Sequence, residues 1–107
     1  MPCNNNILNG APGTTAQFKV TQDNGETLWG HLTDLDRSSG VQTGTDFSGS
    51  ALRAGIEFPL VAGHSYHFLI IKMPSGGNIK VQAKVPNNVL TPCTDTGRFI
   101  GPWIIRV

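Results

Sequence analysis

The sequence predicts an all-β fold, a small antiparallel β-sandwich of about seven short strands with negligible helix. Thirteen glycines and seven prolines divide the 107 residues into short segments, as frequent turns between strands require. Several segments alternate apolar and polar residues, which is the pattern of a strand with one wet face. No longer segment repeats apolar residues at the helical spacing of 3.6. A chain of this length forms a single domain, 1–107, in which we expect 1–15 to be an N-terminal arm or loop.

The first strong local signal is a turn between two alternating segments. Residues 16–21 (AQFKVT) place Phe18 and Val20 on one face, and 27–33 (TLWGHLT) follow after Asp23-Asn24-Gly25-Glu26. Asn-Gly is the strongest short hairpin signal, because both residues tolerate positive φ. The pattern therefore predicts a hairpin that pairs 16–21 with 27–33.

The next stretch, 34–50, is long, polar and rich in glycine and serine. It predicts a loop with at most one short strand at 41–43, and long loops in compact domains are commonly functional. Residues 51–58 (ALRAGIEF) alternate loosely and predict a strand that ends at Pro59.

The longest apolar run of the chain, at 60–72, predicts the central strand. Its sequence LVAGHSYHFLIIK begins with a turn signal at Ala62-Gly63 and continues with β-branched and aromatic residues. Residues 78–85 (NIKVQAKV) then alternate strictly, which predicts a strand with one buried face. The last strand, 98–107, is interrupted by Gly101-Pro102, and this predicts an edge position or a bulge.

One short motif in the central run carries a family resemblance. The spacing Leu60-x-Ala62-Gly63-x-x-Tyr66-x-Phe68 resembles the corner between strands E and F of immunoglobulin-like and fibronectin type III domains. The resemblance covers about nine residues. It implies an immunoglobulin-like sandwich with Greek-key connections, in which the Tyr66 hydroxyl bonds back to the backbone, and it implies no function.

The two cysteines, Cys3 and Cys93, lie near opposite ends of the chain. They predict a disulfide, which would stabilise the fold by roughly 4 kcal/mol in the chain-entropy model; the alternative is two separate thiols. With a surface rich in Asn, Thr and Gly, a disulfide favours a secreted, extracellular protein. No signal peptide precedes Cys3, so we expect the mature form, and no segment is long and apolar enough for a membrane span.

The charge balance argues against several partner classes. Charged residues make up 14% of the chain and the formal net charge is +1. This provides no electrostatic reason to expect nucleic acid or an anionic membrane surface as a partner. The expected partners are therefore a glycan or an extracellular protein.

The sequence contains no motif typical of an enzyme or a metal centre. His64 and His67 are three apart in a strand and point to opposite faces, so they chelate poorly; a metal site would need His31 to converge with Asp34 or Asp36. No cofactor and no metal are expected. Calcium is the one alternative, because Asp34 and Asp36 alternate as in a calcium loop that lacks its later ligands.

The remaining signals indicate a non-catalytic binding module. Sugar-binding proteins combine polar side chains that recognise hydroxyls with an aromatic ring for stacking. We assign the polar role to Asp34, Asp36 and Asp46, and the stacking role to Phe47, Trp103 or Trp29; the alternative for Phe47 and Trp103 is a place in the core. The first hypothesis is a secreted lectin-like carbohydrate-binding module. The second is an adhesin-, fibre- or capsid-type subunit that forms a homo-oligomer through the edge strand 103–107.

Overall fold

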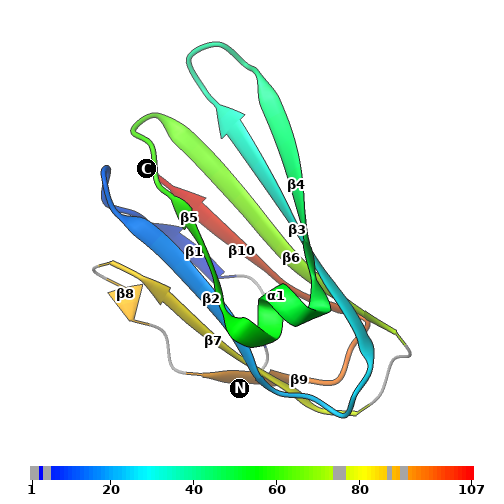
Figure 1. The fold of residues 1–107 in the computed structure, drawn as a ribbon. Coiled ribbons are helices and arrows are strands. Elements are labelled where there is room, and N and C mark those ends of the chain that lie inside the picture. Colours follow the sequence, from blue (N-terminus) through cyan, green and yellow to red (C-terminus); the bar gives the residue numbers. More distant parts are fainter. Residues whose placement is uncertain (1–2, 4–5, 74–76, 87, 90–91) are drawn as a thin grey trace.

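The computed structural model describes the whole chain except residues 1–2, 4–5, 74–76, 87 and 90–91. It is an all-β sandwich of two sheets that pack face to face (Figure 1). The described residues form ten strands and one short helix, so the predicted fold class is confirmed, with more strands than the predicted seven.

The first sheet has the order β1-β10-β6-β3-β4. Its strands are β1 (Asn6–Asn9), β10 (Phe99–Arg106), β6 (His64–Met73), β3 (Thr27–Asp36) and β4 (Gln42–Ser48). β1 runs parallel to β10, and the other neighbours are antiparallel. The predicted central strand is confirmed, because β6 lies between β10 and β3 in the middle of this sheet.

The second sheet has the order β5-β2-β7-β8, and β9 also pairs with β7. Its strands are β5 (Ile56–Pro59), β2 (Thr15–Gln22), β7 (Ile79–Val85), β8 (Asn88–Val89) and β9 (Cys93–Asp95). β7 alternates buried and exposed residues along its whole length, which confirms the predicted strand with one wet face.

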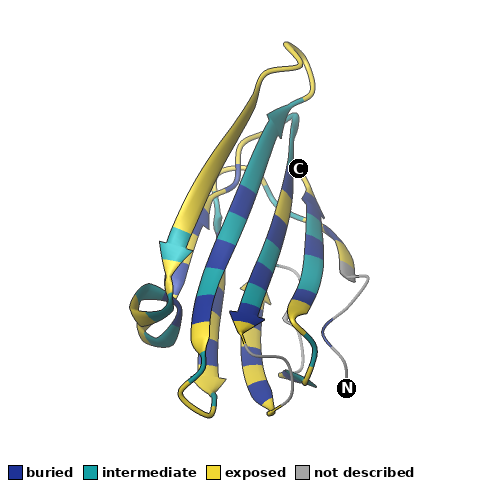
Figure 2. Ribbon diagram, turned by 90° about the vertical axis from the view of Figure 1, so that its right-hand side faces the viewer, coloured by how far each residue is buried: buried dark blue, intermediate teal, exposed yellow. Residues whose placement is uncertain are grey.

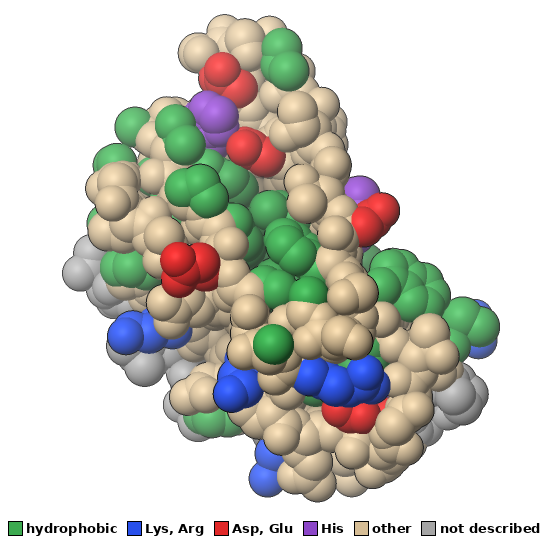
Figure 3. All heavy atoms as spheres, viewed as in Figure 1, with side chains coloured by type: hydrophobic (Ala, Val, Ile, Leu, Met, Phe, Trp, Pro, Cys, Tyr) green, Lys and Arg blue, Asp and Glu red, His purple; other side chains and the backbone are tan. Residues whose placement is uncertain are grey.

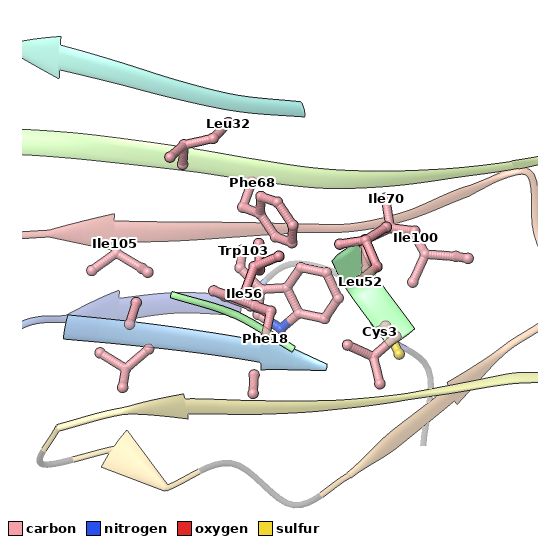
Figure 4. Packing of buried hydrophobic residues seen from close by; sticks show 14 of the residues in the cluster. Cys3, Phe18, Leu32, Leu52, Ile56, Phe68, Ile70, Ile100, Trp103 and Ile105 are labelled. Atoms are coloured by element: carbon pink, nitrogen blue, oxygen red, sulfur yellow. The ribbon is translucent and has the colours of Figure 1, made fainter. Parts of the chain in front are cut away.

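The core fills the space between the inner faces of the two sheets (Figure 4). Its centre is aromatic. The Phe18 ring lies 4.6 Å from the Phe68 ring and 5.1 Å from the Trp103 ring, measured between centroids. Each fully buried aromatic or aliphatic side chain stabilises the fold by about 1.5–3 kcal/mol, before the entropy of ordering it is subtracted.

The corner before β6 has the hydrogen bond that the family resemblance implies. The Val61 amide donates to the Tyr66 hydroxyl at 2.9 Å. Tyr66 is buried, and burial raises the pKa of its phenol. The corner carries the chain from β5 in the second sheet to β6 in the first.

The predicted hairpin of 16–21 with 27–33 is wrong. Both segments are strands, but β2 lies in the second sheet and β3 in the first. Each has one apolar face, and both of these faces line the core between the sheets. The connection is held by the helix α1 (Gly49–Ala54), because the Arg53 guanidinium donates to both Asp23 carboxylate oxygens and to the Glu26 carbonyl. The hydrogen bonds from Arg53 also lower the pKa of Asp23.

The predicted polar loop at 34–50 is wrong, and the predicted strand at 51–58 is confirmed only from Ile56, where β5 begins. Residues 34–48 extend β3 and form β4, and a tight turn connects the two strands. The helix α1 (Gly49–Ala54) follows and joins the two sheets. Ser48 caps it by accepting a hydrogen bond from the Ala51 amide, and Gly55, at φ 104°, ends it. Leu52 anchors this single helix in the core.

The first and last strands, β1 and β10, lie side by side in the first sheet. Part of the predicted arm 1–15 is the strand β1, with Leu8 buried and Ile7 exposed. β1 covers β10, so the last strand is not at the edge as predicted; the predicted bulge is present between Ile100 and Trp103. The predicted disulfide is also present, Cys3 being bonded to Cys93 across a sequence separation of 90 residues. No helix in the described part of the chain is long and apolar enough to cross a membrane.

Candidate ligand-binding site

The hairpin of β3 and β4 extends beyond the other strands at one end of the sandwich, and its tip is exposed (Figures 1 and 2). The turn is closed by two backbone hydrogen bonds: Gly40 N–H donates to the Asp36 carbonyl at 2.8 Å, and Asp36 N–H donates to the Val41 carbonyl at 2.9 Å. Gly40 has φ 75°, a left-handed conformation that suits glycine. Arg37 fixes the turn to the sheet by donating to the Gly63 and Val107 carbonyls.

The inner face of β3 changes from apolar to acidic along this hairpin. Leu28 and Leu32 are buried in the core, whereas Asp34 and Asp36, the next residues on the same face, lie where the sandwich opens. Side chains of a strand alternate between faces, so this pattern follows directly from the sequence positions. Two of the predicted binding residues, Asp34 and Asp36, are thereby brought together.

His64, at the start of β6, lies between these two carboxylates. Its Nδ1 is 2.7 Å from Asp34 Oδ1, and its Nε2 is 3.9 Å from Asp36 Oδ2. The three side chains remain partly accessible, with 20% of His64, 30% of Asp34 and 34% of Asp36 exposed. They form a half-buried acidic cluster that solvent and a ligand can both reach.

The hydrogen bonds define what the cluster can offer to a ligand. An ionised carboxylate only accepts, so His64 Nδ1 must carry the proton that it shares with Asp34. In the neutral ring Nε2 is then an acceptor, and in the charged ring both nitrogens donate. Ser38 donates to Asp36 Oδ1 from its hydroxyl and its amide, and these two bonds lower the pKa of Asp36 to about 2.

A cavity of about 330 Å³ opens beside the cluster. Its lining combines acceptors, hydroxyls and one aliphatic side chain: Asp34, Asp36, Ser39, Val41, Thr43 and His64. In Figure 3, acidic side chains flank a histidine near the hairpin tip, and hydrophobic side chains lie in the adjoining hollow. The polar groups are held in place by the bonds to His64 and Ser38, so the site is largely formed before a ligand enters.

The third predicted carboxylate, Asp46, is on the opposite face of the first sheet. It pairs with His31, whose Nδ1 lies 2.6 Å from Asp46 Oδ1, and both side chains are well exposed. Trp29 is partly exposed on the same face of β3, two residues before His31. Asp46 therefore cannot act together with Asp34 and Asp36 on one small ligand.

The predicted stacking role of Trp103 is wrong, and Phe47 is an anchor of the core. Trp103 is 1% exposed and packs against Phe18 and Phe68, so neither face of its ring is open. Phe47 is partly buried, and its ring meets Phe68 edge-on at 6.1 Å. Among the three tryptophan and phenylalanine candidates, Trp29 retains a partly exposed ring without such a contact to the core.

A second cavity, of about 390 Å³, lies on the outer face of the second sheet and was not predicted. Its polar lining comes from long side chains: Gln17, Lys19, Glu57, Gln82 and Lys84. These residues occupy exposed positions of β2, β5 and β7. In the sequence they form the polar half of an alternating pattern, which is the same for any solvent-exposed face of a sheet. Their one mutual hydrogen bond among described residues joins Gln17 to Glu57. The side chains that line this cavity are therefore fixed by fewer mutual hydrogen bonds than those at the hairpin.

His64 is the residue of the candidate site that the sequence interpretation missed. It looked like an isolated turn histidine because 34–50 was expected to be a loop. Had β3 been extended to Asp36, its antiparallel register with β6 would have placed Asp36 opposite His64. The strand register was therefore the missing signal.

Among the described residues, no group of three or more His, Cys, Asp or Glu side chains is arranged to hold a metal ion. Comparison with protein-family models, with curated protein sequences and with solved structures gave no match to this chain. The function must therefore be argued from the geometry of the site.

Proposed function

We propose that the protein is a secreted, non-catalytic carbohydrate-binding module whose ligand enters the cavity at the tip of the β3–β4 hairpin. One observation carries the proposal: Asp34, Asp36 and His64 converge on one preformed cavity that also presents the hydroxyls of Ser39 and Thr43. Carboxylates and hydroxyls in fixed positions recognise the hydroxyl groups of a sugar, and Val41 supplies a small apolar contact.

The charges of the cavity favour a neutral ligand with many hydrogen-bond donors. His64 uses Oδ1 of Asp34, so Asp34 keeps its second oxygen for the ligand, whereas Asp36 bonds to Ser38 and Ser39 and has its Oδ2 3.9 Å from His64 Nε2. Two carboxylates repel an anion, and a large apolar ligand would leave these polar groups without partners. A sugar residue is neutral and rich in hydroxyl groups, so it is neither repelled by the carboxylates nor leaves the polar groups without partners. The disulfide supports the secreted setting, because disulfides persist in oxidising compartments.

The test is a broad glycan array followed by titration calorimetry on the best ligand, with and without a calcium chelator. The double variant Asp34→Asn, Asp36→Asn keeps the side-chain shapes and removes the charges. We expect its affinity to fall by about tenfold or more, because each charge-assisted hydrogen bond contributes about 1.5–3 kcal/mol.

The matched control is Trp29→Ala, which removes an indole ring from the outer face of the same strand and leaves the cavity intact. We expect its affinity to stay within about twofold of the parent. Silence across the array would reject the proposal. So would a glycan whose binding is lost with Trp29→Ala and kept by the double variant, because the site would then lie on the outer face.

A further inference from the structure

The strand β4 forms an edge of the first sheet, and apart from the charge of Asp46 it lacks the usual protections against pairing. Edge strands are commonly protected by lysine, proline, a bulge or short length. β4 is seven residues long, and its sequence QTGTDFS contains neither lysine nor proline. The other edge strands of the described chain, β1, β5, β8 and β9, have four, four, two and three residues. β4 is thus the long, open edge of this molecule (Figure 1).

The backbone groups that β4 turns outward follow from its pairing with β3. Asp36 N–H donates to the Val41 carbonyl, and the register places Gln42 opposite Leu35. Hydrogen-bonded and non-hydrogen-bonded pairs alternate along an antiparallel ladder. Thr43, Thr45 and Phe47 therefore bond to β3, whereas the N–H and C=O groups of Gln42, Gly44 and Asp46 point away from the sheet.

We propose that β4 pairs with β4 of a second copy of this chain, antiparallel and centred on Thr45. In this register Gly44 of each copy forms the hydrogen-bonded pair with Asp46 of the other, and Thr45 faces Thr45. The register uses the full length of the strand. A register centred on Asp46 would instead set two carboxylates against each other, which is unfavourable.

The charges on β4 favour a second copy as the occupant. Asp46 is the one charged residue of the strand, and pairing sets it opposite a glycine. The His31 ring covers that glycine, because a Cβ added to Gly44 would lie 3.1 Å from His31 Cε1. Each Asp46 would thus meet an imidazole of the other copy rather than a second carboxylate. Thr43 and Phe47 face each other on the inner side, where an aromatic and a β-branched side chain pair well.

This pairing replaces the edge strand that the sequence predicted. Residues 103–107 cannot serve, because β10 is covered on both sides by β1 and β6. The β4 pair would join two five-stranded sheets into one continuous sheet. The two hairpin cavities would lie on separate copies, so a ligand with repeated units could bind both and gain avidity.

Sedimentation velocity on the full chain, from about 10 µM to about 1 mM, tests the proposal over the range expected for a small interface. We expect a reversible dimer that is populated at the upper concentrations. The decisive variants are Thr45→Lys and Thr45→Glu, at a position that is exposed in the single chain. Because residue 45 faces itself, each variant alone should dimerise about tenfold more weakly or worse, and an equal mixture should recover dimers.

Thr27→Lys is the matched control, since it adds the same charge at an exposed position of β3 away from β4. It should dimerise like the parent, and thermal unfolding should confirm that all variants are folded. A parent that stays monomeric at about 1 mM overturns the proposal. A dimer that Thr45→Lys leaves unchanged, or a mixture that recovers nothing, also overturns it. None of these outcomes depends on glycan binding.

Discussion

The strand β6 places a titratable side chain on the inner face at each of its ends. The side chain at one end is fully buried, and the one at the other end is partly exposed. Near the last residues, Lys72 is fully buried; its ammonium donates to the Gly77 and Thr96 carbonyls at 3.1 and 3.3 Å and lies 3.9 Å from Glu26. At the first residue, His64 stays 20% exposed, and its ring is held by the carboxylate of Asp34.

The difference separates a structural charge from one that is available to a ligand. Backbone carbonyls that surround a buried ammonium cannot be exchanged without opening the fold, so Lys72 belongs to the closed end of the sandwich. His64 and its two carboxylates belong to the open end, because they are partly exposed and a ligand can reach them without opening the fold. Substitutions at the two ends test this contrast.

The largest expected effect is the loss of the disulfide, which ties the closed end together. In the double variant Cys3→Ser, Cys93→Ser, the unfolded chain regains the freedom of a loop of about 90 residues. We expect the free energy of unfolding, measured by urea denaturation, to fall by about 4 kcal/mol. Reduction of the parent with dithiothreitol should give the same loss. An unchanged urea midpoint would show that the crosslink does not stabilise this end.

The second-largest effect is expected from removal of the buried Lys72 ammonium. Lys72→Met keeps an unbranched side chain of similar length but leaves Glu26 and two carbonyls without the charge, and we expect a loss of about 3 kcal/mol. Lys84→Met, on the exposed face of β7, is the control and should change stability by less than about 0.5 kcal/mol. Equal losses of stability for Lys72→Met and Lys84→Met would show that the buried ammonium is not structural.

The corner that leads into the open end should give a smaller effect. Tyr66→Phe removes the hydroxyl that accepts from the Val61 amide, and one such hydrogen bond is worth about 1 kcal/mol. Hydrogen exchange at the Val61 amide should accelerate in the same variant. If exchange stays slow, another group protects this amide and the corner is not held by the tyrosine.

At the open end, substitution should barely change stability. Asp34→Asn retains a hydrogen-bond acceptor for His64, and ion pairs with this exposure contribute less than about 1 kcal/mol. We therefore expect the urea midpoint to stay close to that of the parent. A loss as large as that of Lys72→Met would mean that the acidic cluster is structural.

Acidification should have the smallest effect on stability, and the direction of this effect follows from the pKa of Asp36. The pKa of this carboxyl is lowered from 3.8 to about 2, because Ser38 donates two hydrogen bonds to the charged form. The stabilising contribution is therefore complete above about pH 4 and is lost as the pH falls toward 2. Carbon-detected NMR of the carboxyl should show this midpoint. Ser38→Ala should move the midpoint upward, and an unmoved midpoint would mean that the Ser38 hydroxyl does not lower this pKa.

The sequence predicted the sandwich because strict alternation in 78–85 and the apolar run at 60–72 depend only on local residues. The prediction failed where contacts between residues that are distant in the sequence determine the structure. The Asn24-Gly25 turn signal is the same for a hairpin and for a crossing between sheets, and the clamp from Arg53 selects the crossing. Asp34 and Asp36 were found from residue type, but the role of His64 depended on the register of β3 with β6. Trp103 looked like a free ring because nothing in the sequence shows that it faces Phe18 of the second sheet.

The parallel pairing of β1 with β10 also has a consequence for the order in which the fold is completed. β10 inserts between β1 and β6, so the interior of the first sheet contains a strand that is synthesised after all the other strands of this sandwich. Contacts between such distant segments slow folding, because the loop must close before they form. A growing chain holds β6 with one edge unpaired until residues 99–106 have emerged, and only then can this sheet be completed.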